Sequence, residues 1–271
     1  MDIKRFASAL LGFPLVLLIL ILGNKYIVDI CLAGIALLAM QEYFNAVQKE
    51  CNPIKWLGYI SCIFIALIHI VPENLPTDIT NSILLLIVPI LMLISFGQVI
   101  ITNMKTNFKD VVYTLFGILY VITCISFIAL TRGAENGIIL IWYAIIAAWG
   151  TDTFAYLIGI KFGKHKFSEI SPKKSIEGAI AGIVGAVVIA ILYTMAINAI
   201  YNLEYSYISI IIITAILSIL AQIGDFAASS IKRYVNVKDY SNLIPGHGGM
   251  LDRIDSLMFL APFAYVFFTL I

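Results

Sequence analysis

The stretch GDFAASSIKRYVNVKDYSNLIPGHGGMLDRID, residues 224–255, gathers charged residues, glycine and a histidine between two apolar runs. Most of the remaining chain is apolar: 61% of the 271 residues are hydrophobic and 12% are charged, whereas soluble domains carry about 25% charged residues. Several apolar runs approach or exceed about eighteen residues, which is enough for a helix to cross the hydrocarbon core. Because these runs do not alternate in polarity, helices are favoured over a barrel. The sequence therefore predicts an all-α polytopic membrane protein.

About nine transmembrane helices are expected in a single integral membrane domain, 1–271. They are placed at residues 6–23, 26–40, 56–72, 80–101, 109–130, 137–160, 176–200, 206–228 and 254–271. With the N-terminus in the cytoplasm and the C-terminus outside, all 17 lysines and arginines except Lys25 and Arg132 fall on the inner side, as the positive-inside rule requires. The first run is longer than a signal-peptide core and lacks a small-x-small exit, so we expect an uncleaved span.

The two halves of the chain differ in polar content. Residues 1–130 contain little that suggests chemistry and are expected to form a helical scaffold, with Asp29 and His69 as structural exceptions. The four cysteines are scattered, without a C-x-x-C pair, which is typical of small apolar side chains in helices. Residues 137–271 hold the charged segments and are expected to be the catalytic half. The net charge of +1 gives no indication of a nucleic-acid partner.

Four acids stand in or beside the apolar runs of that second half: Asp152, Asp225, Asp252 and Asp255. A charge near the centre of a transmembrane helix costs roughly 2.5–3.5 kcal/mol on insertion scales, so such residues usually face a cavity, an ion or a partner. Mg²⁺ takes one or two carboxylates and completes its shell with water and phosphate oxygens. Each acid alone fits an interfacial or salt-bridging role, but together they favour a metal site.

Basic residues flank the same region. Ser171-Pro172-Lys173-Lys174-Ser175 precedes the seventh span, and Lys232, Arg233 and Lys238 follow the eighth. A cytoplasmic lysine cluster is ordinarily a topology signal or a contact to anionic lipid. Two clusters beside one group of acids instead suit phosphate oxygens.

A glycine-rich segment lies between Asp225 and Asp252. Pro245-Gly246-His247-Gly248-Gly249 allows the backbone to approach a ligand, and its N–H groups could bind an anion at the start of the next helix. For His247 we favour a binding role. Gly178 and Gly182 form a small-x-x-x-small pair for close helix packing, which leaves open whether the neighbour lies in the same chain or in a second subunit of a homodimer.

Read as S-x-I-K-R, then K-D, then P-G-H-G-G-x-x-D-R-x-D, residues 229–255 closely resemble the signature of phosphatidate cytidylyltransferases, the CDP-diacylglycerol synthases of phospholipid biosynthesis. A second segment is also similar to that family. It runs Asp152-x-x-Ala155-Tyr156-x-x-Gly159-x-x-Phe162-Gly163-Lys164, then Ser171-Pro172-Lys173-Lys174-Ser175-x-Glu177-Gly178, with serine at position 175 where the family more often has threonine. The resemblance covers roughly residues 145–260.

The resemblance implies that CTP and phosphatidate react to give CDP-diacylglycerol and pyrophosphate at the inner face of the cell membrane. The expected cofactor is Mg²⁺, with or without a second cation. The proposed metal ligands are Asp225, Asp252 and Asp255. The proposed catalytic residues are Asp225, Asp252, Lys232 and Arg253, and the proposed substrate-binding residues are Ser229, Lys173, Lys174, Arg233, Lys238, His247, Gly248 and Gly249.

Two other classes of function remain open at this point. A CTP-dependent lipid kinase, which transfers the γ-phosphate to a polyprenol-type alcohol, needs much the same ions and basic residues but releases CDP. An ion-coupled transporter could use the acids as ion ligands, but it predicts polar residues near the middle of the membrane in both halves. The polar residues here gather at the inner face of one half, which favours the enzyme.

Overall fold

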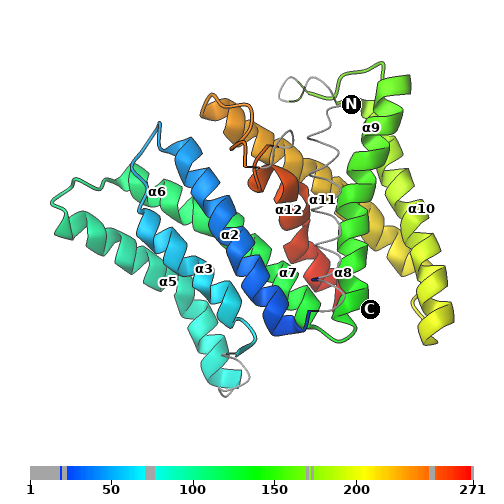
Figure 1. Ribbon diagram of the computed structural model, residues 1–271, viewed down its shortest axis with the longest axis horizontal. Coiled ribbons are helices and arrows are strands. Elements are labelled where there is room, and N and C mark those ends of the chain that lie inside the picture. The colour runs from blue at the N-terminus through cyan, green and yellow to red at the C-terminus, as the bar shows by residue number, and fades with distance from the viewer. Residues whose placement is uncertain are drawn as a thin grey trace. The chain divides into compact units, whose positions relative to one another are not determined.

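The computed structural model describes residues 19, 23–70, 77–168, 171, 174–243 and 248–269. These residues are helical, without a strand in the described ranges (Figure 1). The elements are α2 (Lys25–Val47), α3 (Lys55–Leu67), α5 (Thr77–Ile101), α6 (Phe108–Gly117), η1 (Ile118–Thr123), α7 (Cys124–Gly133), α8 (Gly137–Ile145), η2 (Ile146–Gly150), α9 (Thr151–Phe162), α10 (Ile176–Tyr201), α11 (Tyr207–Tyr234) and α12 (Leu251–Phe268), where η denotes a π-helix.

Five helical segments in the described part of the chain are long and apolar enough to cross a membrane. They are 25–47, 108–133, 137–162, 176–201 and 207–234, and two shorter apolar helices lie at 55–67 and 85–101. The chain is therefore a polytopic helical membrane protein, as expected. The first expected span, 6–23, falls almost entirely outside the described residues.

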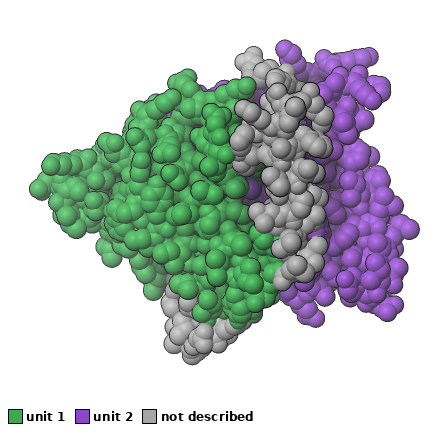
Figure 2. Space-filling view, viewed as in Figure 1, with its two compact units in different colours: residues 1–133, 235–253 green, residues 134–234, 254–271 purple. Residues whose placement is uncertain are grey.

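The helices form two compact units, coloured separately in Figure 2. Unit 1 comprises residues 1–133 and 235–253, and unit 2 comprises residues 134–234 and 254–271. Residues 235–253, which carry much of the polar signature, belong to the same unit as the N-terminal segment.

Unit 1 is built on the packing of α2 against α3, α7 and η1. Glycine makes the close contacts: a Cβ on Gly58 would collide with the Phe44 ring, and one on Gly117 with the Tyr43 ring. Tyr43 is buried and donates its hydroxyl to the Tyr113 carbonyl at 3.0 Å. Large aromatic side chains of α2 thus fill the space that the glycines leave.

Several buried polar side chains of unit 1 have a polar partner within the unit. Asp29, which is fully buried, lies 2.7 Å from Nδ1 of His69, and Arg132 donates to the Gly23 carbonyl at 2.8 Å. Asp110 accepts from the Asn107 N–H in a capping box at the start of α6 and from the Asn52 N–H at 2.7 Å. These contacts agree with the structural interpretation of Asp29 and His69.

Unit 2 places α10 between α9 and α11. Its core is rich in alanine, which allows helices to pack closely around the buried Tyr143, and includes Ala144, Ala147, Ala148, Ala190, Leu217, Ala221, Leu260 and Ala264. Tyr143 shares a hydrogen bond of 2.9 Å with Thr194. The buried aromatic side chain therefore keeps its polar end satisfied.

Glycines bring α10 against α9. A Cβ on Gly178 would meet the Ala155 carbonyl at 2.7 Å, and one on Gly182 would meet the Thr151 carbonyl at 2.8 Å. The small-x-x-x-small pair thus serves packing within this chain, which answers the question that the sequence left open. Figure 1 shows the two helices side by side.

Candidate active site

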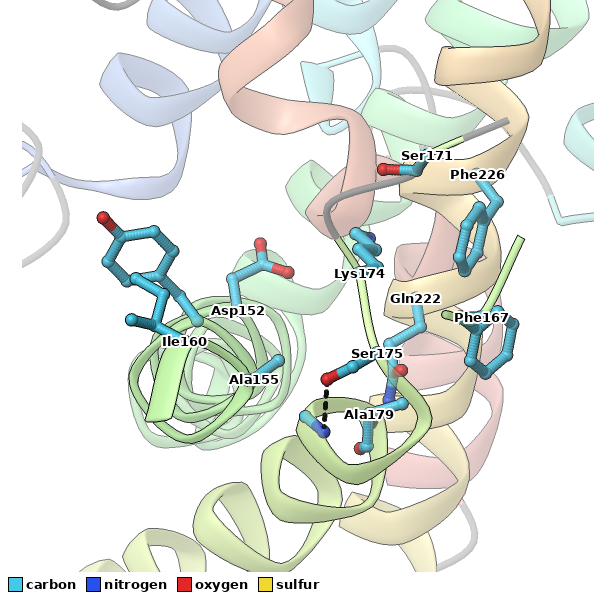
Figure 3. Close-up of a pocket in the computed structure, with 13 residues that line it drawn as sticks. Asp152, Ala155, Ile160, Phe167, Ser171, Lys174, Ser175, Ala179, Gln222 and Phe226 are labelled. Atoms are coloured by element: carbon cyan, nitrogen blue, oxygen red, sulfur yellow. Dashed lines mark hydrogen bonds between the residues drawn. The ribbon is translucent and has the colours of Figure 1, made fainter. Parts of the chain in front are cut away.

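Unit 2 contains a cavity of about 650 Å³ between α9, α10, α11 and the loop that joins α9 to α10 (Figure 3). One part of its wall is polar and another is apolar. The lining residues are Asp152, Ala155, Tyr156, Gly159, Ile160, Phe167, Ser171, Lys174, Ser175, Gly178, Ala179, Gln222 and Phe226. The cavity therefore offers charge and hydrogen-bonding groups beside an aromatic and aliphatic surface.

Lys174 is the centre of charge in this cavity. Its ammonium group forms an ion pair with Asp225 and interacts with the charges of Asp152, Asp255 and Lys232. Burial lowers the pKa of Lys174 below its ordinary value, and the two carboxylates Asp152 and Asp255 oppose that shift. Figure 3 shows the Asp152 carboxylate pointing toward Lys174. Carboxylates from α9, α11 and α12 thus surround one cation.

The acids are held by the helices that carry them. Asp152 is the second residue after η2, and π-helical turns in α-helices frequently mark functional sites. The Ser256 hydroxyl donates to Asp152 Oδ2 at 3.4 Å and so links α12 to α9, while the Ser256 N–H donates to Asp255 Oδ1 at 2.7 Å. The Thr151 hydroxyl is hydrogen-bonded to Ser218 of α11. Short side chains therefore connect the three helices at the level of the acids.

The loop before α10 is shaped by its own hydrogen bonds. Ser175 caps α10 by accepting from the Gly178 N–H at 3.1 Å, drawn as a dashed line in Figure 3. Glu177 accepts from the Lys164 N–H at 3.1 Å and lies 2.6 Å from Nδ1 of His165. The hydroxyl at position 175 caps α10, a role that serine and threonine can both fill.

An aromatic pair lies beside Lys174. The rings of Phe167 and Phe226 stack with centroids 5.0 Å apart, and the Lys174 ammonium lies 4.6 Å from the Phe226 ring centroid. Such cation–π contacts stabilise a partly desolvated ammonium. The rings help to hold Lys174 where it meets the carboxylates.

The other part of the signature lies in unit 1. Asp252 is 8% exposed, and its Oδ2 accepts from the backbone N–H groups of Tyr240 at 2.9 Å and Gly249 at 3.0 Å. The next two N–H groups, of Met250 and Leu251, donate to Glu42 of α2. These three N–H groups at the start of α12 are therefore bonded to carboxylates of the chain itself.

Gly248 and Gly249 are favoured as glycine for different structural reasons. Gly248 has φ +87°, a left-handed conformation that favours glycine. Gly249 has the carboxylate of Glu42 where a Cβ would stand. Each glycine thus has a structural reason within unit 1.

The structure brings together some of the residues singled out in the sequence. Asp152, Lys174, Asp225, Lys232 and Asp255 interact within unit 2, and Ser229 is half-buried on α11. Arg233, Lys238 and Arg253 are exposed, and Asp252 lies in the first turn of α12, in the part of that helix that belongs to unit 1. Lys173 and His247 lie outside the described residues.

Sequence reasoning did not single out Gln222, Phe167, Phe226, Ser256 or Glu42. The first four have ordinary identities for a membrane helix or a loop, and no pattern marks them. Glu42 had a signal, because a carboxylate in an apolar helix is costly. It was missed because the expected span ended at residue 40, whereas α2 continues to Val47.

Asp152, Asp225 and Asp255 are the carboxylates beside Lys174 that could take part in holding a metal ion. Across residues 23–70, 77–168, 174–243 and 248–269, no three acidic, histidine or cysteine side chains are grouped as ligands for one metal ion. Mg²⁺ commonly takes only one or two carboxylates and fills its shell with water and phosphate. The Lys174 ammonium among three carboxylates marks a place that favours positive charge.

Comparison with known proteins identifies the family. A model described as the cytidylyltransferase family matches residues 3–271. The chain belongs to this family. As a member of the cytidylyltransferase family, the chain is a nucleotidyltransferase. Its apolar helices make it a membrane protein, and Asp152 and Lys174 line its cavity.

Relatives of this cytidylyltransferase family member carry a more specific name. This chain is 33% identical over 261 residues to a phosphatidate cytidylyltransferase of Staphylococcus haemolyticus, and the match covers 95% of each chain. It is 38% identical over 178 residues to one of Bacillus subtilis, covering 65% of this chain and 64% of the relative. A third, from Thermotoga maritima, is 37% identical over 169 residues, which is 60% of this chain and 61% of the relative.

Proposed function

We propose that this chain transfers the cytidylyl group of CTP to phosphatidate, giving CDP-diacylglycerol and pyrophosphate. The observation that carries the proposal is the cavity of unit 2, where Lys174 lies among carboxylates from three helices in a member of the cytidylyltransferase family. The names of the relatives support the choice of substrates.

The proposed reaction joins two negatively charged phosphate groups, so it depends on positive charge in the site. An oxygen of the phosphatidate phosphate attacks the α-phosphorus of CTP, and the bond from that phosphorus to the bridging oxygen breaks to release pyrophosphate. Because the attacking phosphate is already ionised, no general base is required. Catalysis then depends on positioning and on neutralising negative charge. Lys174 and Lys232 supply that charge beside the cavity.

Other basic residues are assigned to phosphate binding by their place in the signature. Arg233, Lys238 and Arg253 are exposed and within reach of solvent-borne CTP. Ser229 follows Asp225 by four residues and shares its helical face. Lys173, His247, Gly248 and Gly249 remain proposed substrate-binding residues.

Mg²⁺ is the proposed cofactor, with or without a second cation. Asp225 and Asp255, with Asp252 one turn earlier on α12, are the proposed ligands, and Asp152 joins them because it interacts with the same Lys174. The bound cation supplies charge stabilisation to phosphate oxygens. The chain's own contribution is the set of carboxylates that holds the cation and the lysines that bind phosphate beside it.

We further propose nine spans with the N-terminus in the cytoplasm and the C-terminus outside, in a cell membrane of the inner or cytoplasmic type. The distribution of lysine and arginine supports this orientation. It puts the loops around Lys174 and Asp252 on the cytoplasmic side, where CTP is dissolved and phosphatidate is present in the adjoining leaflet.

Labelled CTP tests the function. Purified protein in detergent receives phosphatidate and CTP labelled at the α- or at the γ-phosphate, with and without Mg²⁺. The proposal expects the α-label in lipid, the γ-label in pyrophosphate, and no transfer without Mg²⁺. Transfer of the γ-label to an added polyprenol would instead identify a lipid kinase, and no transfer under any condition would contradict both enzymes.

A further inference from the structure

The carboxylate of Glu42 on α2 lies inside unit 1, 5% exposed, and is bonded to a segment about two hundred residues later. Its Oε1 accepts from the Ser241 hydroxyl at 2.6 Å and from the Met250 N–H at 2.9 Å. Its Oε2 accepts from the Leu251 N–H at 2.8 Å. One side chain therefore holds both ends of the segment 241–251.

Because the Glu42 carboxylate is buried, it and the segment 241–251 stabilise each other. An ionised carboxylate removed from water is costly unless it is hydrogen-bonded, and the three donors to Glu42 come from the segment 241–251. The two backbone N–H groups lie at the first turn of α12, where a negative charge is also favoured by the helix dipole. Glu42 supplies the acceptors for these N–H and hydroxyl groups, and the segment supplies the donors that offset the burial of the carboxylate.

Asp252 is positioned by the same turn. Its Oδ2 accepts from the Gly249 N–H, and Glu42 accepts from the Met250 and Leu251 N–H groups, so three consecutive donors are divided between two carboxylates. Rotation of this turn would move the Asp252 carboxylate together with its N–H partners. The orientation of Asp252 thus depends on Glu42 through this shared turn of unit 1.

Gly249 shows how tightly the turn lies against α2. A Cβ on Gly249 would stand 2.8 Å from Oε1 of Glu42 and closer to its other carboxylate atoms. Because the carboxylate is fixed by three hydrogen bonds, it cannot move aside without losing them. Glycine at 249 is required by Glu42.

We propose that Glu42 is a positioning residue for the reaction, which holds Ser241, Met250 and Leu251 and thereby places the Asp252 carboxylate. The proposal rests on the proposed function, in which Asp252 acts on substrate or metal. It assigns the N-terminal half a part in holding Asp252 and its neighbours in the signature, in addition to its part as a scaffold.

The test compares Glu42→Gln with Asp110→Asn in full-length purified protein. Asp110 is a matched control, because it is a buried carboxylate of the same unit that accepts backbone N–H groups away from the segment 241–251. Glutamine keeps the size of Glu42 but has one oxygen, so the Met250 or the Leu251 N–H loses its acceptor. A displacement of about 1 Å can cost about a hundredfold in rate.

We expect Glu42→Gln to lower kcat at saturating CTP and phosphatidate by at least about tenfold, with a thermal midpoint no lower than that of Asp110→Asn. Asp110→Asn should keep kcat within about twofold. If Glu42→Gln keeps wild-type kcat, or if Asp110→Asn loses as much kcat, the role of Glu42 is only structural and the proposal is overturned.

A second variant keeps the proposal testable where Glu42 variants do not fold. Gly249→Ala leaves the charge of Glu42 in place and presses on its carboxylate, so kcat should again fall. Shortening the acid in Gly249→Ala/Glu42→Asp makes room for the new methyl group, and we expect kcat to recover several-fold relative to Gly249→Ala alone. Wild-type kcat in Gly249→Ala would contradict the proposal.

Hydrogen exchange separates this proposal from the proposed function. In peptides that cover 235–253, Glu42→Gln should exchange faster than wild type and Asp110→Asn should not. Absence of cytidylyl transfer by the wild-type protein would contradict the proposed function. Faster exchange in Glu42→Gln would still show that Glu42 orders the segment covered by these peptides. Unchanged exchange in Glu42→Gln would overturn the positioning role itself.

Discussion

At the scale of single residues, the signature acids divide between shaping the chain and carrying charge. Asp252 does the first through Oδ2, which accepts two backbone N–H groups. Asp152, Asp225 and Asp255 surround Lys174 in unit 2. A substitution that removes charge but keeps hydrogen bonds can separate these two functions.

Asp252→Asn is such a substitution. The amide oxygen can accept from both Tyr240 and Gly249 N–H groups, so the free energy of unfolding should change by less than about 1 kcal/mol. The charge is lost, and we expect turnover to fall by at least about a hundredfold. Cytidylyl transfer over a range of Mg²⁺ concentrations measures this. Near-normal turnover with unchanged Mg²⁺ dependence would remove Asp252 from the metal site.

Lys174→Gln tests the centre of the cavity. The substitution leaves three carboxylates without the cation that they share, and it removes a phosphate-binding group. We expect kcat/KM for CTP to fall by about a hundredfold or more, because a buried charge-assisted contact is lost. Lys166→Gln, an exposed lysine of the same loop, is the control and should leave kcat/KM unchanged. Equal effects at the two positions would refute the central role of Lys174.

Sequence reasoning identified residues by the cost of placing charge in an apolar helix. That cost marks Asp152 and Asp225 without knowledge of the fold. It does not mark Ser256 or Gln222, whose side chains are polar but inexpensive to bury when hydrogen-bonded. It marks Glu42 only when the helix is given its true end, and hydropathy does not locate helix ends.

At the scale of elements, the close contact between α9 and α10 depends on two glycines of α10, Gly178 and Gly182, which have no side chain. A β-carbon on Gly182 would lie 2.8 Å from the Thr151 carbonyl oxygen, and one on Gly178 would lie 2.7 Å from the Ala155 carbonyl oxygen. Larger residues would separate the helices that form two walls of the cavity.

Gly182→Val should therefore destabilise the protein by about 1–3 kcal/mol through overpacking. Its thermal midpoint in detergent measures the loss. Gly34→Ala is the control, since nothing lies within 4 Å of the added Cβ and alanine is favoured in a helix. A midpoint for Gly182→Val equal to that of Gly34→Ala would show that α9 and α10 can separate at no cost.

Helix positions were predictable from the long apolar runs, whereas the capping residues at their ends were identified only in the structure. Asn24 begins α2 by accepting from the Ile27 N–H at 2.9 Å, and Asn107 begins α6 in a capping box. The π-helices η1 and η2 were not predictable, since an apolar span shows its length but not its hydrogen-bond register. η2 matters for the site because Asp152 follows it.

At the scale of the whole molecule, the two units depart from the order of the chain. Hydropathy is local, so it places residues 235–253 beside the spans that flank them in sequence. Three hydrogen bonds to Glu42, across separations of 199 to 209 residues, tie the segment to unit 1 instead. A pairing of this kind leaves no trace in composition or in spacing.

The orientation in the membrane gives the last prediction. With the N-terminus inside, the exposed Lys105 lies on the cytoplasmic side and the exposed Glu204 lies outside. Glu204→Cys should therefore react with a membrane-impermeant maleimide in intact cells, and Lys105→Cys only after permeabilisation. The wild-type chain is the background control. Its Cys51 should contribute little, because burial and the nearby Asp110 raise the pKa of the thiol to about 11.

Reaction of both variants in intact cells, or of neither, would contradict the alternation of spans. These two sites do not decide the number of spans, because an eight-span chain that lacks the run 6–23 gives the same labelling with its N-terminus outside. An epitope at the N-terminus decides it. We expect that epitope to be protected in intact cells, since Lys4 and Arg5 hold the N-terminus on the inner side. Antibody binding without permeabilisation would leave eight spans and the same cytoplasmic loops, so the proposed active site would keep its side of the membrane.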